Sequence, residues 1–66
     1  MASVVEIKPA RDEDGFCLRF GDLGPIWFAF EHQAVSYAQE VFTTAEIIVY
    51  YRDDVINYRL PPSASK

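Results

Sequence analysis

Few side chains in this sequence are of types that could carry out catalysis, and His32 is the only histidine among its 66 residues. A histidine acts as a general base when it lies within hydrogen-bonding reach of the proton it abstracts. His32 has no visible nucleophile partner, and it falls at the expected start of a helix, where the helix dipole disfavours the imidazolium form. We therefore interpret His32 as a solvated surface residue.

Cys17 is the only cysteine, and its chemistry depends on whether its thiol is activated. A thiol becomes reactive when neighbouring positive charge lowers its pKa, and Arg19, on the same face of the same expected strand, is the one nearby candidate. We interpret Cys17 as a small apolar residue without a reactive role. A single cysteine forms no internal disulfide and no multi-cysteine zinc site. This usage favours a reducing cytoplasm over secretion.

The acidic run "DEDG", Asp12 to Gly15, is the remaining candidate for ligand chemistry. A calcium loop spaces its ligands alternately over about twelve residues and ends in a glutamate, a pattern that this run lacks. We interpret it as a solvated hairpin loop. Because no two polar groups combine into a mechanism, we expect no catalytic residue, no metal site, no cofactor and no enzymatic activity.

Charge and hydropathy restrict the classes of partner. The formal net charge is −4, and the six basic residues are scattered along the sequence. Because nucleic-acid binding gains much of its affinity from basic residues that release phosphate counterions, direct nucleic-acid binding is disfavoured. The start "MASVVEIKPAR" lacks the pattern of a signal peptide, and no apolar run approaches the roughly 20 residues of a membrane span. We expect a cytoplasmic protein without membrane contact.

Hydrophobic periodicity predicts the elements that must position these side chains. Alternation or continuous β-branched and aromatic residues predict strands in "SVVEIKP", "FCLRF", "IWFAF", "IIVYY" and 55–60, and helical spacing predicts a helix from Glu31 to Phe42 or Thr43. We predict an α+β fold, an antiparallel sheet of four to five strands with one helix on one face, in the order β-β-β-α-β-β. It forms a single domain over residues 1–60, with a mobile tail at 61–66.

The second face of this sheet is the main question that the sequence raises. One helix covers one face, and we expect it to pack on alternate apolar residues, namely Phe16, Leu18, Phe20, Ile26, Phe28 and Phe30. In "IIVYY" both faces are apolar, so either Ile48 and Tyr50 or Ile47, Val49 and Tyr51 could point away from the helix. Continuous apolar strands are usually buried on both sides, and a chain this short buries only about 60% of its unfolded surface.

We therefore predict that a second copy of the chain covers this face, because symmetric dimers are the commonest oligomers and interfaces favour aromatic residues and arginine. The predicted interface consists of Cys17, Arg19, Trp27, Ala29, Ile48 and Tyr50. The alternative is that these aromatic residues lie in the core of one chain or remain half exposed.

Two family resemblances cover parts of the chain. The segments "DGF", "QAVSYA" and "AEIIVYYRDDVI" resemble, in the same order, a family of small uncharacterised bacterial β-β-β-α-β domains, and this resemblance implies the fold. The hairpin "DEDGFCLRFGDLG" is similar to that of the N-terminal domain of HicB-type antitoxins, over residues 5 to 42. That resemblance implies a partial RNase H-like fold without catalytic residues.

These observations favour a small non-enzymatic binding or structural module that forms a homodimer. The first alternative is an antitoxin-like protein whose acidic surface neutralises a basic protein partner. The second is a binder of single-stranded nucleic acid, in which aromatic rings of the sheet stack on bases and Arg19 and Arg59 support the backbone.

Overall fold

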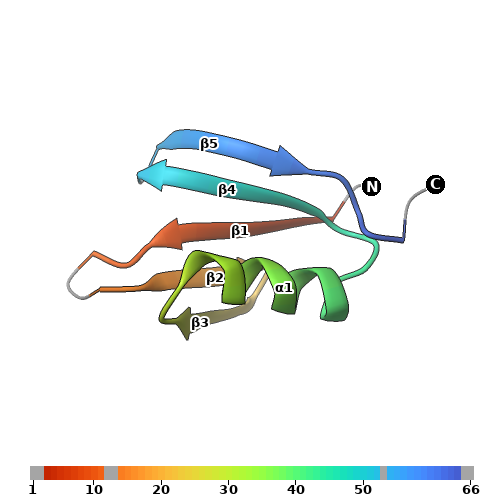
Figure 1. Cartoon of the computed structure of the whole chain (residues 1–66). Helices are drawn as coiled ribbons and strands as arrows, with labels where there is room; N and C mark the ends of the chain where they lie inside the picture. The colour runs from red at the N-terminus through yellow and green to blue at the C-terminus, as the bar shows by residue number, and fades with distance from the viewer. Residues whose placement is uncertain (1–2, 12–13, 53, 65–66) are drawn as a thin grey trace.

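The computed structural model describes residues 3–11, 14–52 and 54–64, which form one mixed sheet with one helix on it (Figure 1). The elements in chain order are β1 (Val4–Pro9), β2 (Phe16–Phe20), β3 (Leu23–Phe28), α1 (Glu31–Val41), β4 (Glu46–Arg52) and β5 (Val55–Leu60). The α+β class and the element order are confirmed. The predicted hairpin loop after β1 and the turn after β4 include positions 12, 13 and 53, which lie outside the described residues.

The strand order across the sheet is β3-β2-β1-β4-β5. The pairs β1–β2, β2–β3 and β4–β5 are antiparallel, but β1 and β4 run parallel, so the sheet is mixed and the expectation of a wholly antiparallel sheet is wrong at this pair. The connection through α1 explains the difference. Because β3 runs in the direction of β1 and the helix carries the chain back along the sheet, β4 starts in that same direction when it joins the sheet beside β1.

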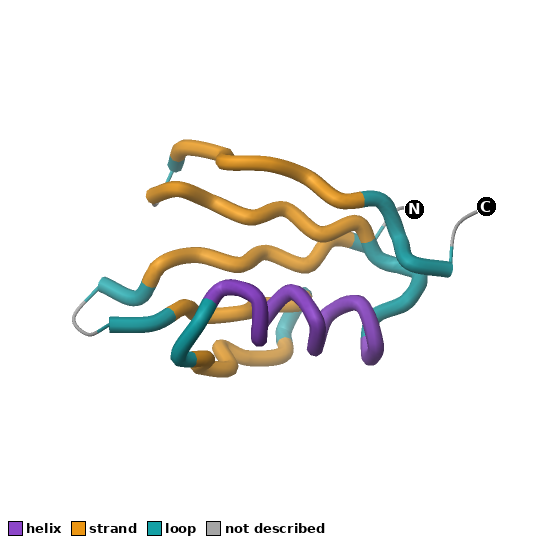
Figure 2. The backbone as a smooth tube through the Cα atoms, in the orientation of Figure 1, coloured by secondary structure: helices purple, strands orange, loops and turns teal. Residues whose placement is uncertain are grey.

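The hydrophobic core lies between α1 and one face of the sheet. Among the described residues, the wholly buried hydrophobic side chains are Val5, Ile7, Leu18, Ala34, Ala38, Ala45, Ile47 and Val49. Aromatic rings extend this core towards the C-terminal end of the helix, where Phe20 stacks on Phe42 with 4.4 Å between ring centroids. The helix packs against β1, β2, β3 and β4, and Figure 2 shows it lying on one face of the sheet, roughly along the direction of the strands.

The ends of α1 follow from residues on both sides of it. The N-cap is Phe30, which has no side-chain acceptor, as the weak cap in the sequence predicts. Instead the side-chain Oε1 of Gln33 accepts a hydrogen bond from the backbone N–H of Phe30 at 3.3 Å, which is one half of a capping box. At the other end the backbone N–H of Phe42 donates to the carbonyl of Ala38 at 2.8 Å, and the helix stops there.

The segment after β5 lies against the C-terminal end of α1. The hydroxyl of Ser63 donates to the carbonyl of Gln39 at 2.7 Å, and the backbone N–H of Ala64 donates to the carbonyl of Thr43 at 2.9 Å. The bond to Gln39 satisfies one of the carbonyl groups that a helix end leaves without intrahelical partners, and the bond to Thr43 holds the segment beside the helix end. The mobility expected for residues 61–66 stays a prediction, and positions 65 and 66 lie outside the described residues.

Two alanines let the helix approach the sheet closely, and enlarging one of them tests the packing. Ala38 is wholly buried, whereas Ser36 is exposed on the same helix. We expect Ala38→Leu to lower the free energy of unfolding by about 1–3 kcal/mol because the added carbons overpack the core. The control Ser36→Leu should change it by no more than about 0.5 kcal/mol. Urea unfolding measures both, and an equal effect of the two changes would contradict this packing.

Candidate functional site

The sheet face away from α1 carries most of the residues that the sequence predicts as an interface. Val5, Ile7, Leu18, Ile47 and Val49 point towards the helix, and the alternating positions therefore point to the other side. We call that side the open face. In the order of the strands, its residues include Val4, Glu6, Lys8, Cys17, Arg19, Trp27, Glu46, Ile48, Tyr50 and Arg59.

Strand register arranges these side chains in two rows across the open face. In the first row Trp27 is the partner of Cys17, and Cys17 is the partner of Lys8. The second row runs from Arg19 to Glu6, then to Ile48 and Arg59. Directly opposite side chains in a sheet are about 4.5–5.5 Å apart at Cβ, so each row forms a continuous surface.

Five of the six predicted interface residues share the open face, and Ala29 does not. The ambiguity in "IIVYY" is resolved, because Ile47 and Val49 are buried under the helix and Ile48 and Tyr50 take the open side. Ala29 lies in the bend beyond β3, because pairing with β2 ends at the partners Phe16 and Phe28. The expected strand through Phe30 is therefore too long at that end.

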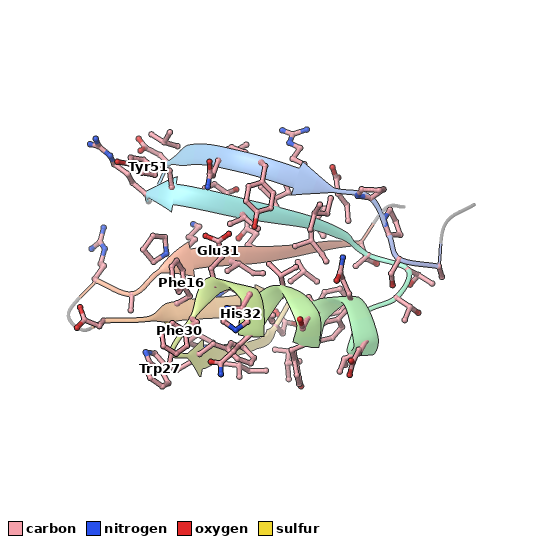
Figure 3. The ribbon with its side chains drawn as sticks, in the orientation of Figure 1. Phe16, Trp27, Phe30, Glu31, His32 and Tyr51 are labelled. Atoms are coloured by element: carbon pink, nitrogen blue, oxygen red, sulfur yellow. The ribbon has the colours of Figure 1, made fainter. Side chains whose placement is uncertain are left out.

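Phe30 is likewise misplaced by the sequence, which puts it in the core with Phe28. As the N-cap of α1 it leaves the strand, and its side chain is 59% exposed. Its ring stacks on the imidazole of His32, with 5.7 Å between the centroids. Figure 3 shows both side chains on the helix side of the molecule.

Trp27 is held in place at the edge of the open face. Its indole Nε1–H donates to the carbonyl of Asp14 at 3.0 Å, and the indole lies against Gly15, where an added Cβ would stand 2.5 Å from Nε1. The ring nevertheless keeps 51% of its surface exposed. A fixed aromatic ring with free surface offers contact area at little cost in side-chain entropy.

Tyr50 is held by the two charged residues beside it on β1. Its hydroxyl donates to Oε2 of Glu6 at 3.1 Å, and Nζ of Lys8 lies 4.9 Å from the centroid of its ring. Burial, the hydrogen bond and the negative charge of Glu6 raise the pKa of the Tyr50 hydroxyl, whereas the positive charge of Arg59 opposes the rise. The hydroxyl therefore stays protonated at neutral pH and continues to donate to Glu6.

Three of the six basic residues, which are scattered in the sequence, lie on one face of the sheet. Lys8, Arg19 and Arg59 share the open face, together with the carboxylates of Glu6 and Glu46. The alternation of strand residues contained the signal for this arrangement, since Lys8 and Arg19 each occupy one of the alternate positions that point away from the core. Only the register between strands shows that they are neighbours.

The helix side of the molecule is acidic by comparison. The helix carries Glu31 and Glu40 and no lysine or arginine. The hydroxyl of Tyr58 on β5 donates to Oε2 of Glu31, and so links α1 to the strand that the helix does not cover. Burial, this hydrogen bond and the charge of Glu31 raise the pKa of Tyr58 to about 12. A cleft of about 360 Å³ adjoins this pair and includes Phe16 and Tyr51 in its wall (Figure 3).

Within residues 3–11, 14–52 and 54–64, no three His, Cys, Asp or Glu side chains gather as a metal site would need. The helix in these ranges falls short of the length and apolar character that a membrane crossing requires.

Comparison with known proteins adds no relative: no protein-family model, no curated protein and no solved structure matches the chain. The resemblances to the small bacterial domains and to HicB-type antitoxins stay predictions from the sequence.

The close packing of the Trp27 indole against Gly15 gives a prediction about stability. Gly15 has φ +117° with the indole against it, whereas Gly21 has φ +57° and no neighbour within 4 Å. Alanine at either position is strained by a positive φ, at about 1–2 kcal/mol. We expect Gly15→Ala to cost more than Gly21→Ala, because the new methyl would also meet the indole of Trp27 and the carbonyl oxygen of Phe28. Thermal unfolding followed by Trp27 fluorescence compares them. Equal losses of stability in the two variants, with an unchanged emission spectrum, would show that Gly15 does not position the indole of Trp27.

The bond between Tyr58 and Glu31 gives a prediction about alkaline pH. The pKa of Tyr58 is about 12 in the folded chain and its ordinary value is 10.0, so the unfolded chain loses this proton first. The stabilising contribution is complete below pH 10 and is lost as the pH rises towards 12. The stability difference between the wild type and Tyr58→Phe should therefore narrow across that window, as measured by urea unfolding.

Two glutamate variants control for this effect. Glu31→Gln removes the charge beside Tyr58 and should also flatten the alkaline decline, whereas Glu40→Gln removes an exposed carboxylate from the same helix and should follow the wild type. If the difference in unfolding free energy between the wild type and Tyr58→Phe stays constant from pH 10 to pH 12, the proposed linkage to the Tyr58 proton is refuted.

Proposed function

We propose that the protein is a non-enzymatic binding module that recognises an acidic protein partner through the open face of its sheet. The observation that supports this most is the exposure of Trp27 on a face where Lys8, Arg19 and Arg59 also lie. Tryptophan and arginine are enriched among residues that dominate interface energetics. We place this activity in the cytoplasm, because the lone Cys17 suits a reducing compartment.

Charge favours an acidic partner for this face. The chain as a whole is at −4, yet the open face carries Lys8, Arg19 and Arg59 against Glu46 and Glu6, and the carboxylate of Glu6 already accepts the hydroxyl of Tyr50. The acidic helix side would repel an acidic partner and the open face would attract it. Such complementarity orients the encounter and raises the association rate more than the final affinity.

A symmetric homodimer across the same face is the second candidate. Glu6 and Arg19 are cross-strand partners, so opposite charges lie side by side on the open face. In a two-fold interface each patch meets its own copy, and alternating charges of this kind can pair across the axis. Trp27, Ile48 and Tyr50 would then supply the apolar contacts between the copies.

Two matched variants test the proposal. Trp27 and Phe30 are exposed to similar extents, 51% and 59%, but Trp27 belongs to β3 and Phe30 is the N-cap of α1. We expect Trp27→Glu to abolish recovery of the partner in a pull-down from host lysate, and Phe30→Glu to preserve it. The captured partner should be acidic, and its association should weaken with added salt, since charges near the surface are screened over about 8–10 Å.

Light scattering on the same variants tests the homodimer. A wild-type mass of two chains that falls to one in Trp27→Glu alone supports the second candidate. Partner recovery that is equal in the two variants, or a captured basic protein or nucleic acid, would overturn the first.

A further inference from the structure

We propose that a cavity on the open face binds the oxyanion group of a small organic anion, a phosphate monoester or a carboxylate. The cavity has a volume of about 290 Å³, and the side chains of Lys8, Arg11 and Arg19 help to line it. This inference rests on the proposed function, because it assigns a ligand chemistry to part of the same face.

The positive lining comes from separate segments that the fold brings together. Lys8 belongs to β1, Arg11 to the connection after it, and Arg19 to β2. Lys8 and Arg19 alternate with buried residues on neighbouring strands, so the sheet fixes their backbone positions. Arginine presents a planar fork that matches phosphate and carboxylate oxygens, and lysine adds a compact charge.

The one carboxylate in the lining does not cancel this charge. Lys8 and Arg19 against the anion of Glu6 leave a formal charge of +1 in this part of the lining, in a chain whose total is −4. Oε2 of Glu6 accepts a hydrogen bond from the hydroxyl of Tyr50 on β4, so one of its two carboxylate oxygens is already engaged by a donor. Lys8 remains close to the ring of Tyr50, which limits the positions open to its ammonium group.

The rest of the lining sets the size and character of the ligand. Pro9, Cys17 and Pro25 add apolar surface beside the cations. A fully hydrated inorganic ion would gain nothing from this surface, whereas an anion with a compact apolar body would bury part of it. Trp27, the strand partner of Cys17, borders this region and offers a ring for an aromatic ligand.

Cys17 gives the cavity its own reporter, because it is the only cysteine in the chain and it is half buried in the lining. Alkylation by iodoacetamide, a neutral reagent, should slow when an anion occupies the cavity. The probes are phenyl phosphate, inorganic phosphate, succinate and neutral phenol, at constant ionic strength. We expect protection by phenyl phosphate or succinate and none by phenol.

Three methionine variants identify the cations that act. Arg19→Met and Lys8→Met keep most of the aliphatic stem, and each should weaken binding by about tenfold, the effect of one charge-assisted hydrogen bond. Arg52→Met removes the same charge from an exposed arginine that packs over Tyr51 outside the cavity, and should change little. Amide chemical shifts recorded in the same titrations should move around Lys8, Cys17 and Arg19.

The outcomes separate this proposal from the proposed function. Absence of Cys17 protection and of shifts at millimolar probe, or an equal loss in Arg52→Met, would overturn the anion site. If the anion site failed this test but Trp27→Glu still abolished recovery of the protein partner, the open face would remain the contact surface and only the anion site would be rejected. Protection by inorganic phosphate equal to that by phenyl phosphate would overturn the role of the apolar lining.

Discussion

A single helix of eleven residues packs on one face of a five-stranded sheet, and this one-sided packing is the constraint on which the rest of the molecule depends. The wholly buried hydrophobic residues of the described chain all belong to the layer between α1 and the sheet or to its margin. Ala34 and Ala38 keep the helix close enough for that layer to exclude water. The opposite face of the sheet is left without a covering element, and its residues must either meet solvent or meet a partner.

That open face is neither a dry apolar surface nor an ordinary solvated one. Its two rows combine a fixed and half-exposed Trp27 with basic side chains and the pair formed by Glu6 and Tyr50. Fixed rings and oriented charges lose little entropy on binding, which is why such a surface suits recognition by a small and otherwise marginal domain. The small excess of basic over acidic residues on this face, against the acidic helix, gives the molecule a direction in which an acidic partner would approach.

Hydrogen bonds between side chains and distant segments complete the fold around this sheet. Trp27 bonds to the hairpin before β2, Tyr58 ties β5 to the start of α1, and Ser63 bonds to the end of α1. Each bond joins parts of the chain that share no regular backbone pairing. In a domain of this size, contacts of about 1 kcal/mol are a sizeable share of the stability.

The sequence by itself determined the element types, because hydrophobic alternation and helical spacing are local properties of the chain. The bounds of "FCLRF", the helix start at Glu31 and the weak cap of that helix match the structure, whereas the expected helix end at Phe42 or Thr43 lies one or two residues beyond Val41. Residues on one strand could be assigned to a face, which is why Cys17 and Arg19 were placed together correctly.

Only the tertiary structure decided which strands are neighbours, since pairing depends on contacts between residues far apart in the sequence. The insertion of β4 beside β1 made the sheet mixed, gave Ile48 and Tyr50 to the open face, and brought Glu6 within reach of Tyr50. Register likewise gathered basic residues that the sequence scatters. Local periodicity cannot carry this information, because either face of "IIVYY" satisfies the same pattern until the helix covers one of them.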